Sequence, residues 1–353
     1  MHPTLLFYCQ HSLGLGHLFR SLALCTELAQ HFRIVLLCGG KLPSTIRIPD
    51  TVHVVPLPPL GAAVDGRLIS HDGRRSLDRA RRLRREIILK TFRSMRPEVI
   101  LIEFFPFGKK RFTGELVPLL DEARALGPNA PLIACSIRDI LVSRGAHQQK
   151  HDDHASELAN RYFDAVLVHS DPNFARFEDS FHPRVPLQTP IHYTGFVVSN
   201  GASHNGAHKR GREILVSAGG GIVGEPLLRT AMAAHRLGPL KDVPMKVVAG
   251  PFLDEKKWRS LRAESRGRTG LTLRRSVPDL GVALHSASAS VSQCGYNTAL
   301  DILRAGVPAL VVPFAEGEED EQEQRAHHLQ KLGAVRVLDS EALDPSTLAE
   351  EID

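Results

Sequence analysis

Near the end of the chain, small polar residues and glycine follow an apolar segment in an arrangement suited to binding phosphate. Residues 290–291 are predicted to end a buried strand, and a helix is predicted to begin near Asn297-Thr298. The run Ser292-Gln293-Cys294-Gly295-Tyr296 lies between them. Since the first N–H groups of a helix have no partner within it, an anion can bind there. We therefore expect a diphosphate to be bound by Gln293, Gly295, Asn297 and Thr298.

A second helix start lies further along the chain and carries carboxylate and carboxamide groups. Glu321 and Gln322 follow the apolar segment 309–313, and such groups suit a neutral polyol such as ribose or a hexose. The alternative is a solvated helix start, since residues 316–321 form an acidic run that the helix dipole favours. Together with the first motif, these residues predict a nucleotide-sugar site.

This pattern resembles the C-terminal, donor-binding half of the GT-B glycosyltransferases, among them the UDP-glycosyltransferases and the family 28-type N-acetylglucosaminyltransferase of peptidoglycan synthesis. In that superfamily a Thr-His-Cys-Gly-Trp-Asn-Ser motif wraps the diphosphate, and the aligned run here has Gln293 in place of the histidine and Tyr296 in place of the tryptophan. Because Gln293 carries no charge, binding would depend mainly on backbone amides. The family's Asp-Gln pair matches Glu321-Gln322 before Ala326.

Two further segments of this half gain meaning from the resemblance. Gly219, Gly220 and Gly221 follow the predicted strand 214–216 and expose amides for close approach to a phosphate or an acceptor sugar. The alternative is a plain flexible turn. Val277 lies in the stretch whose backbone holds the nucleobase in the family, and the resemblance implies contacts to a pyrimidine edge. The alternative there is a surface turn before a helix.

The N-terminal half has its own glycine motif after the first predicted strand. Gly14 and Gly16 precede His17, and we expect both glycines to contact the donor diphosphate. Phe19 occupies the third glycine position of a dinucleotide fingerprint, which disfavours an NAD site. In GT-B relatives a Gly-His at this location lies beside the acceptor, as general base or phosphate contact. We expect His17 to be the base and either Glu103 or Asp139 to orient it. Arg20 could contact phosphate or brace the loop, and His169, at a strand end, is a candidate for the ligand cleft.

The resulting mechanism is a metal-independent, inverting transfer of a sugar from a nucleoside-diphosphate sugar, UDP-linked by resemblance, to an unidentified acceptor hydroxyl. A neutral imidazole at His17 would accept the hydroxyl proton, and the glycine loops and helix N-termini would stabilise the leaving group. Some nucleotide-sugar hydrolases share the Gly-His-x-x-Arg loop, so water activation by His17 is the alternative. A non-catalytic binding module and an epimerase are the remaining possibilities.

Composition agrees with an α/β enzyme. Of the chain's residues, 42% are hydrophobic and 24% charged. The length of 353 residues exceeds the usual size of a single hydrophobic core and favours two domains. Five scattered cysteines, no apolar segment long enough to span a membrane and no signal peptide fit a cytoplasmic location. We expect no cofactor and no metal. His151 and His154 have ligand-like spacing, but the metal interpretation is the weaker one.

The net charge of +5 is concentrated between residues 67 and 96, where arginines alternate with apolar residues at helical spacing. This predicts an amphipathic helix with a basic outer face. That face is either simply solvated or attracts an anionic acceptor or a membrane surface. Few aromatic residues are interleaved with the basic ones, which argues against nucleic acid as a partner.

Predicted strands alternate with helices throughout, which indicates two Rossmann-like domains with a cleft between them. The predicted strands are 5–9, 34–38, 52–57, 99–102, 132–135, 165–168, 213–217, 245–249, 271–274, 288–291, 309–312 and 334–338. We place an acceptor domain at 1–199, a polar, glycine-rich linker at 200–212 and a donor domain at 213–353. The GT-B fold usually ends with a helix that crosses back onto the first domain. The sequence stops in the first turns of a helix, so we expect that element to be absent or truncated.

Overall fold

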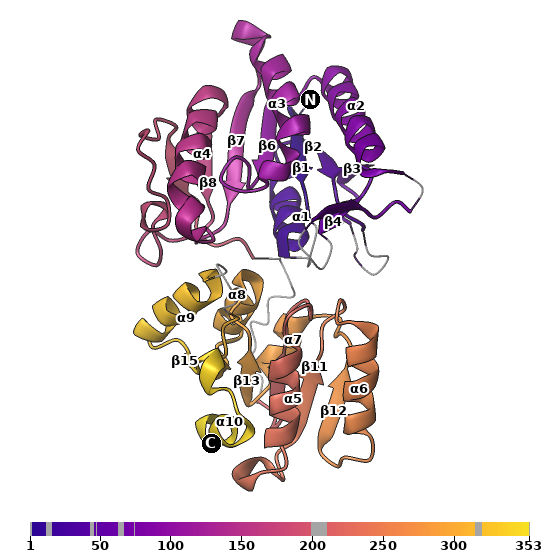
Figure 1. Cartoon of the computed structure of the whole chain (residues 1–353), viewed down its shortest axis with the longest axis vertical. Coiled ribbons are helices and arrows are strands. Elements are labelled where there is room, and N and C mark those ends of the chain that lie inside the picture. The colour runs from indigo at the N-terminus through magenta and orange to yellow at the C-terminus, as the bar shows by residue number, and fades with distance from the viewer. Residues whose placement is uncertain are drawn as a thin grey trace. The chain divides into compact units, whose positions relative to one another are not determined.

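The computed structural model describes residues 2–11, 16–42, 46, 48–62, 67–73, 75–198, 210–314 and 320–352. It divides into two compact units, Met1–Ser199 and Asn200–Asp353, each built around its own parallel sheet (Figure 1). The α/β fold class predicted from the sequence is confirmed. Three predicted features lie outside the described residues: Gly14, the linker segment 200–209 and most of the acidic run, 316–319.

The first unit contains a seven-stranded parallel sheet in the order β3-β2-β1-β6-β7-β8-β9. Its strands are β1 (Thr4–Cys9), β2 (Arg33–Cys38), β3 (Val52–Pro56), β6 (Val99–Glu103), β7 (Leu132–Ile137), β8 (Ala165–Val168) and β9 (Ile191–Tyr193). Its helices are α1 (Gly16–Leu28), α2 (Leu77–Met95), α3 (Thr113–Arg124) and α4 (Gln148–Tyr162), and a two-stranded hairpin pairs β4 (Leu60–Ala62) with β5 (Leu68–Ser70). The hairpin and β9 were not predicted.

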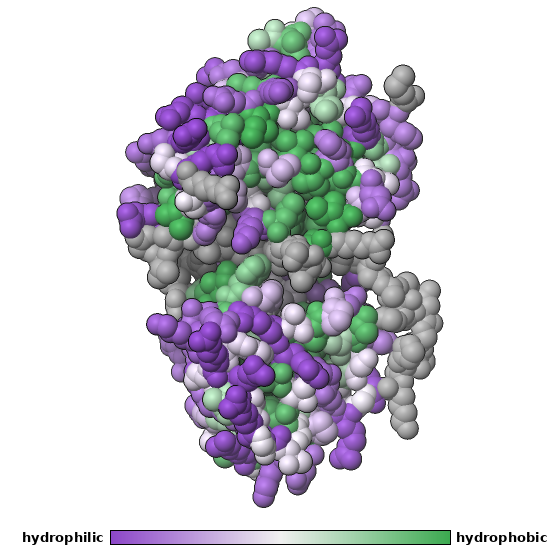
Figure 2. All heavy atoms as spheres, turned by 90° about the vertical axis from the view of Figure 1, so that its right-hand side faces the viewer, coloured by the Kyte–Doolittle hydropathy of each residue, from purple (hydrophilic) through white to green (hydrophobic). Residues whose placement is uncertain are grey.

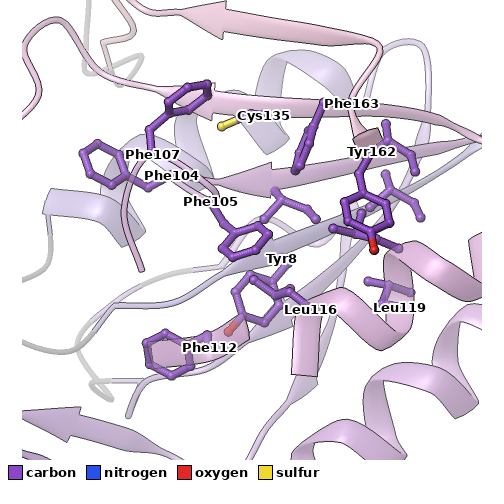
Figure 3. Close-up of a cluster of buried hydrophobic side chains, with 14 of the residues drawn as sticks. Tyr8, Phe104, Phe105, Phe107, Phe112, Leu116, Leu119, Cys135, Tyr162 and Phe163 are labelled. Carbon is purple, nitrogen blue, oxygen red and sulfur yellow. The ribbon is translucent and has the colours of Figure 1, made fainter. Parts of the chain in front are cut away.

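The apolar strands of this sheet are buried on both faces, as the covering helices require. Successive side chains of β1 point to opposite faces, so Leu6 and Tyr8 belong to one core and Leu5 and Phe7 to the other. The first core is closed by α2, α3 and α4, and Figure 3 shows its aromatic centre around Tyr8. The second core is closed by α1. The sheet is therefore a rigid support for residues at its strand ends.

Helix α2 is the basic amphipathic helix that the sequence predicts. Ser76 caps it by accepting a hydrogen bond from the Arg79 N–H, and it buries an apolar stripe including Ile88. Arg84 is the exception to the basic outer face: it is fully buried and donates hydrogen bonds to Glu115 Oε1 (2.6 Å) and to Tyr8 Oη (3.1 Å). Figure 2 views the side of the molecule where α2 lies in Figure 1, and hydrophilic side chains there surround a hydrophobic area of the first unit.

The second unit contains a six-stranded parallel sheet in the order β12-β11-β10-β13-β14-β15. Its strands are β10 (Ile214–Ser217), β11 (Met245–Val248), β12 (Leu271–Arg274), β13 (Ala289–Ser292), β14 (Ala309–Val311) and β15 (Arg336–Val337). Its helices are α5 (Glu225–Ala234), α6 (Glu255–Ser265), α7 (Leu280–Ser286), α8 (Tyr296–Ala305), α9 (Glu321–Lys331) and α10 (Pro345–Ile352). Leu348 and Ala349 of α10 are buried in the core of this unit.

Each sheet has one point at which the order of its strands reverses. In the first unit it lies between β1 and β6, and in the second between β10 and β13. Loops leaving the carboxyl ends of two such strands diverge to opposite faces of the sheet, which leaves a crevice where ligands bind in open α/β sheets. The predicted motifs around His17 and around Gly295 follow these central strands. Within the described residues, no helix is long and apolar enough to cross a membrane.

Candidate functional site

His17 and Glu103 are brought together by two adjacent strands. His17 lies in the first turn of α1, which follows β1, and Glu103 is the last residue of β6, which pairs directly with β1. His17 Nδ1 lies 2.5 Å from Glu103 Oε1. The carboxylate is fully buried, whereas the imidazole side chain is 20% exposed. Of the two acids that the sequence left open as partners of His17, the structure therefore selects Glu103.

The other acid candidate and Arg20 have different places. Asp139 is buried, and its Oδ1 accepts a hydrogen bond from the Ile140 N–H at 2.9 Å. Arg20 is 3% exposed and donates to the same Oε1 of Glu103 that contacts His17. Of its two predicted roles, this contact favours bracing, because the guanidinium holds the carboxylate from inside the protein.

The electrostatics of this pair favour a neutral imidazole beside an ionised carboxylate. Burial lowers the pKa of His17 to about 3, with Lys109 and Arg20 acting in the same direction and Glu103 opposing them. Burial alone would raise the pKa of Glu103, but His17, Lys109 and Arg20 together hold it well below its ordinary value. With the proton of the neutral ring on Nδ1, facing the carboxylate, Nε2 carries the lone pair.

His169 is enclosed in the first unit. It follows β8 and is 1% exposed, and its ring nitrogens lie 2.7 Å from Ser136 Oγ and 2.7 Å from Thr194 Oγ1. Burial lowers its pKa to about 3. The sequence predicted a residue at the ligand cleft. The hydrogen bonds instead give His169 a supporting role, joining β7 to the segment that follows β9.

In the second unit, the turn between β13 and α8 has the predicted form. Gly295 is the N-cap of α8 and, having no side chain, makes no side-chain cap hydrogen bond to the first turn. A Cβ added at Gly295 would meet no atom within 4 Å, which indicates open space before the helix. A helix N-terminus that begins at a glycine beside open space is suited to bind an anion.

The glycine-rich loop after β10 lies against this turn. Gly219 and Gly221 have φ angles of 54° and 88°, a region that favours glycine, and a Cβ at Gly221 would lie 2.4 Å from the Ala249 carbonyl oxygen. A Cβ at Gly219 would lie 3.7 Å from Thr298 Oγ1. The predicted diphosphate residues Gly219, Gly220, Gly221, Gly295 and Thr298 are thus gathered at one edge of the sheet, as are Gln293 and Asn297 of the same turn.

Two buried serine hydroxyls lie at this edge of the sheet. Ser217 and Ser292 are the last residues of β10 and β13 and are register partners. Each is at most 2% exposed, and among the described residues the Oγ atoms of both have no hydrogen-bond partner. Buried hydroxyls without partners are costly. Because they lie where the two loops leave the sheet, a bound ligand or water that reached them would remove this cost.

Two side chains of helix α9 form hydrogen bonds with the backbone of the same turn. Gln322 Oε1 accepts hydrogen bonds from the N–H groups of Cys294 (3.1 Å) and Phe314 (3.4 Å), so its carboxamide oxygen supports the turn and only its NH₂ group is available to a polyol. Arg325, 2% exposed, donates from Nη1 to the Cys294 carbonyl at 2.8 Å. Sequence reasoning missed Arg325, although its place directly before Ala326 of the family pattern could have indicated it. Glu321 is the first residue of α9 and is half-buried.

Val277 lies between β12 and α7, in a segment held by its neighbours. Asp279 caps α7 by accepting from the Val282 N–H, and Arg275 donates to the Leu253 carbonyl at 2.7 Å. The side chain of Val277 is half-buried. Its backbone contacts with a nucleobase remain a prediction.

The histidines at 151 and 154 are separated by acids that serve the fold. Asp152 Oδ2 accepts from the His182 N–H at 2.9 Å, and Asp153 Oδ1 accepts from the Arg184 N–H. These bonds anchor the segment after η4 (Phe177–Asp179) to α4. Within the part of the chain that the structure describes, no group of three or more His, Cys, Asp or Glu side chains is arranged to hold a metal ion.

The second unit is similar in sequence to glycosyltransferases. Residues 270–353 match the glycosyltransferase family 28 C-terminal domain. Two relatives, from Nitrosococcus oceani and Acidithiobacillus ferrooxidans, are named UDP-N-acetylglucosamine–N-acetylmuramyl-(pentapeptide) pyrophosphoryl-undecaprenol N-acetylglucosamine transferase. The first is 35% identical over 77 residues (22% of this chain and 21% of the relative), and the second 26% identical over 137 residues (39% and 38%). The matched segments thus span well under half the length of these relatives.

Solved structures resemble the chain over its whole length. The calicheamicin glycosyltransferase CalG4 has a TM-score of 0.64 at 18% identity, covering 100% of this chain and 89% of the other. MurG of Acinetobacter baumannii has a TM-score of 0.57 at 15% identity, covering 100% and 90%. The fold is that of the GT-B glycosyltransferases, and the resemblance to this superfamily expected from the sequence is confirmed.

Proposed function

We propose that this protein is a glycosyltransferase that moves a sugar from a nucleoside-diphosphate sugar to an acceptor hydroxyl. The observation that carries the proposal is the contact of 2.5 Å between His17 and the buried Glu103 at the strand-order reversal of the first unit. The second unit supports it with a helix that begins at a glycine N-cap, a glycine loop with left-handed φ angles and, at the same sheet edge, two buried hydroxyls that no described residue pairs with. The two units thus supply a base and an anion site.

In this mechanism His17 Nε2 accepts the proton of the acceptor hydroxyl as its oxygen attacks the anomeric carbon. An imidazole of pKa about 3 is always neutral at physiological pH but holds a proton weakly. The ionised Glu103 stabilises the imidazolium that forms, so the base depends on its partner. A single attack of this kind inverts the anomeric configuration.

The leaving diphosphate would lie at the N-terminus of α8, with the loop of Gly219 and Gly221 against it. Fixed N–H dipoles can take the place of a divalent cation there, and we therefore propose a metal-independent transfer. A UDP-linked donor is proposed because the relatives that match the second unit are named for UDP-N-acetylglucosamine. Glu321 and the NH₂ group of Gln322 would contact hydroxyl groups of the ribose or the sugar.

The test uses the full chain with UDP and a panel of UDP- and dTDP-sugars. We expect UDP to bind with a measurable heat, and sugar transfer to an acceptor panel to fall by about 10²–10⁴-fold in His17→Gln and Glu103→Gln, the range of general-base catalysis. UDP affinity should be unchanged in both. His154→Gln, an exposed histidine on α4, is the matched control.

Three outcomes separate the readings. Transfer that is lost in both variants but kept in His154→Gln supports the proposal. UDP release with no acceptor present, lost in His17→Gln, would assign water as the nucleophile and a hydrolase instead. Absence of UDP binding at millimolar concentration would contradict the donor site altogether.

A further inference from the structure

The loop after β6 folds back over the end of its own strand. Phe104 and Lys109 have φ angles of 68° and 58°, in the left-handed region that non-glycine residues rarely adopt. The Gly108 N–H donates to the Phe104 carbonyl at 2.7 Å, and a Cβ at Gly108 would lie 2.2 Å from Phe104 Cδ1. The backbone of Lys109 is therefore held close to the Phe104 ring. Two strained residues in one short loop are typical of functional sites.

The Phe104 ring links this loop to His17. Its centroid lies 5.8 Å from that of the His17 ring, in an edge-to-face arrangement, and the Arg138 guanidinium carbon lies 5.5 Å from it. Arg138 follows β7, the strand beside β6. Arg138 and His17 thus flank one aromatic side chain at the carboxyl edge of the sheet, next to the loop that carries Lys109.

Three cationic residues, Arg20, Lys109 and Arg138, lie at this edge with two acids, Glu103 and Asp139. The carboxylate of Glu103 is already engaged by His17 and Arg20. The half-buried ammonium of Lys109 forms no hydrogen bond or ion pair with any residue that the structure describes. Burial and the charges of Arg138 and Arg20 lower the pKa of Lys109, against the opposing effect of Glu103. A half-buried cation without a bonded partner is costly and is suited to receive an anion.

We propose that Lys109 and Arg138 bind an anionic group of the acceptor, a phosphate or a carboxylate, beside His17. This inference rests on the function proposed above and names the class of acceptor: a hydroxyl compound that also carries a negative charge. Lysine acts as a point charge and arginine as a planar donor, so the two together can hold an oxyanion from two sides. The alternative is that Lys109 only balances the negative charge of Glu103. Arg20 already balances that charge by direct contact.

Full-length protein with isotope-labelled histidines allows a direct test by NMR, with inorganic phosphate as the probe. The ring signals of His17, assigned by their loss in His17→Gln, are followed by NMR during titration at constant ionic strength, with and without saturating UDP. We expect a saturable shift, weakened at least about tenfold in Lys109→Met and Lys109→Gln and retained in Lys109→Arg. Lys110→Met removes an equal charge from the adjacent, exposed residue and should change nothing.

Acetate in place of phosphate distinguishes a carboxylate from a phosphate group. An unchanged titration in both Lys109→Met and Lys109→Gln would overturn the inference, as would an equal loss in Lys110→Met. UDP binding, measured on the same samples by calorimetry, separates the two proposals. Lys109-dependent phosphate binding without UDP binding would keep the anion subsite and remove the donor site. The reverse result would remove the subsite alone.

Discussion

Asp301 offers a sharp test of the electrostatics worked out for the second unit. It is a half-buried residue of α8, and a Cβ at Gly281 would lie 3.9 Å from its Oδ1 and 3.2 Å from Oδ1 of Asp279. The two carboxylates therefore face the same small space. Burial raises the pKa of Asp301 from 3.8 to about 6, Asp279 adds to the rise, and Arg304 opposes it.

The sign follows from linkage. An acid whose pKa is raised by folding binds its proton more tightly in the folded state, so its favourable contribution is present below about pH 4 and is lost as the pH rises through about 6. At about 1.4 kcal/mol for each pKa unit, the whole effect is about 3 kcal/mol. We expect Asp301→Asn to stabilise the second unit at pH 8 by about 1–3 kcal/mol and to have little effect at pH 4.

The chain supplies its own probe, since its one tryptophan, Trp258, lies in α6 of the second unit. Urea titrations followed by Trp258 fluorescence between pH 4 and 8 would give the free energy of unfolding of this unit alone. His235, whose pKa burial lowers, titrates with the opposite slope in this range, so the difference between variant and wild type is the quantity to plot.

Asp279→Asn is the partner control for this experiment. Asparagine preserves the cap of α7, so the variant removes the neighbouring charge without breaking the helix start. We expect Asp279→Asn to stabilise the second unit at pH 8 by part of the amount expected for Asp301→Asn, because Asp279 causes part of the raised pKa of Asp301. A stability difference between Asp301→Asn and wild type that did not vary between pH 4 and 8 would refute the reasoning, because it would mean that Asp301 ionises at its ordinary pKa.

Two further predictions concern the donor site. Gly221→Ala should lower UDP affinity at least about tenfold, because a Cβ there would lie 2.4 Å from a carbonyl oxygen. Gly267→Ala, with a φ of 68° but no atom within 4 Å, carries the backbone strain without the clash and should bind UDP normally in the same calorimetric titration. Arg325→Met should weaken UDP binding at least about tenfold while leaving uridine binding unchanged, since the charge acts on the phosphates. Equal weakening of both ligands would assign Arg325 to the fold alone.

Much of the fold could be predicted because parallel strands, buried on both faces, are short apolar segments that stand out from the helices between them. The predicted segments 5–9 and 165–168 correspond to β1 and β8 almost residue for residue. The hairpin of β4 and β5 was missed because three-residue strands carry no period. Arg84 could have been placed correctly: it lies four residues after Ala80 and four before Ile88, within the buried stripe of α2.

The partner of His17 could not be predicted, since it depends on strand order. Glu103 and Asp139 both follow apolar strands, and no local feature ranks them. In the sheet, β6 lies directly beside β1, whereas β7 is one strand further away. A side chain at the end of β6 reaches the start of α1. The contact joins residues 86 positions apart, which is decided by topology and not by the sequence near either residue.

Gln293 stands where the motif that the sequence resembles has a histidine, and Arg325 supplies a positive charge near the same turn. Both backbone groups of Cys294 are held by α9, its N–H by Gln322 and its carbonyl by the buried guanidinium. The Cys294 carbonyl and the Gly295 N–H belong to one peptide unit, so a charged donor on the oxygen polarises that unit and strengthens its N–H as a donor. That N–H belongs to the N-cap of α8, where the diphosphate is proposed to lie. A positive charge behind the turn can thus serve the anion in place of one in front of it.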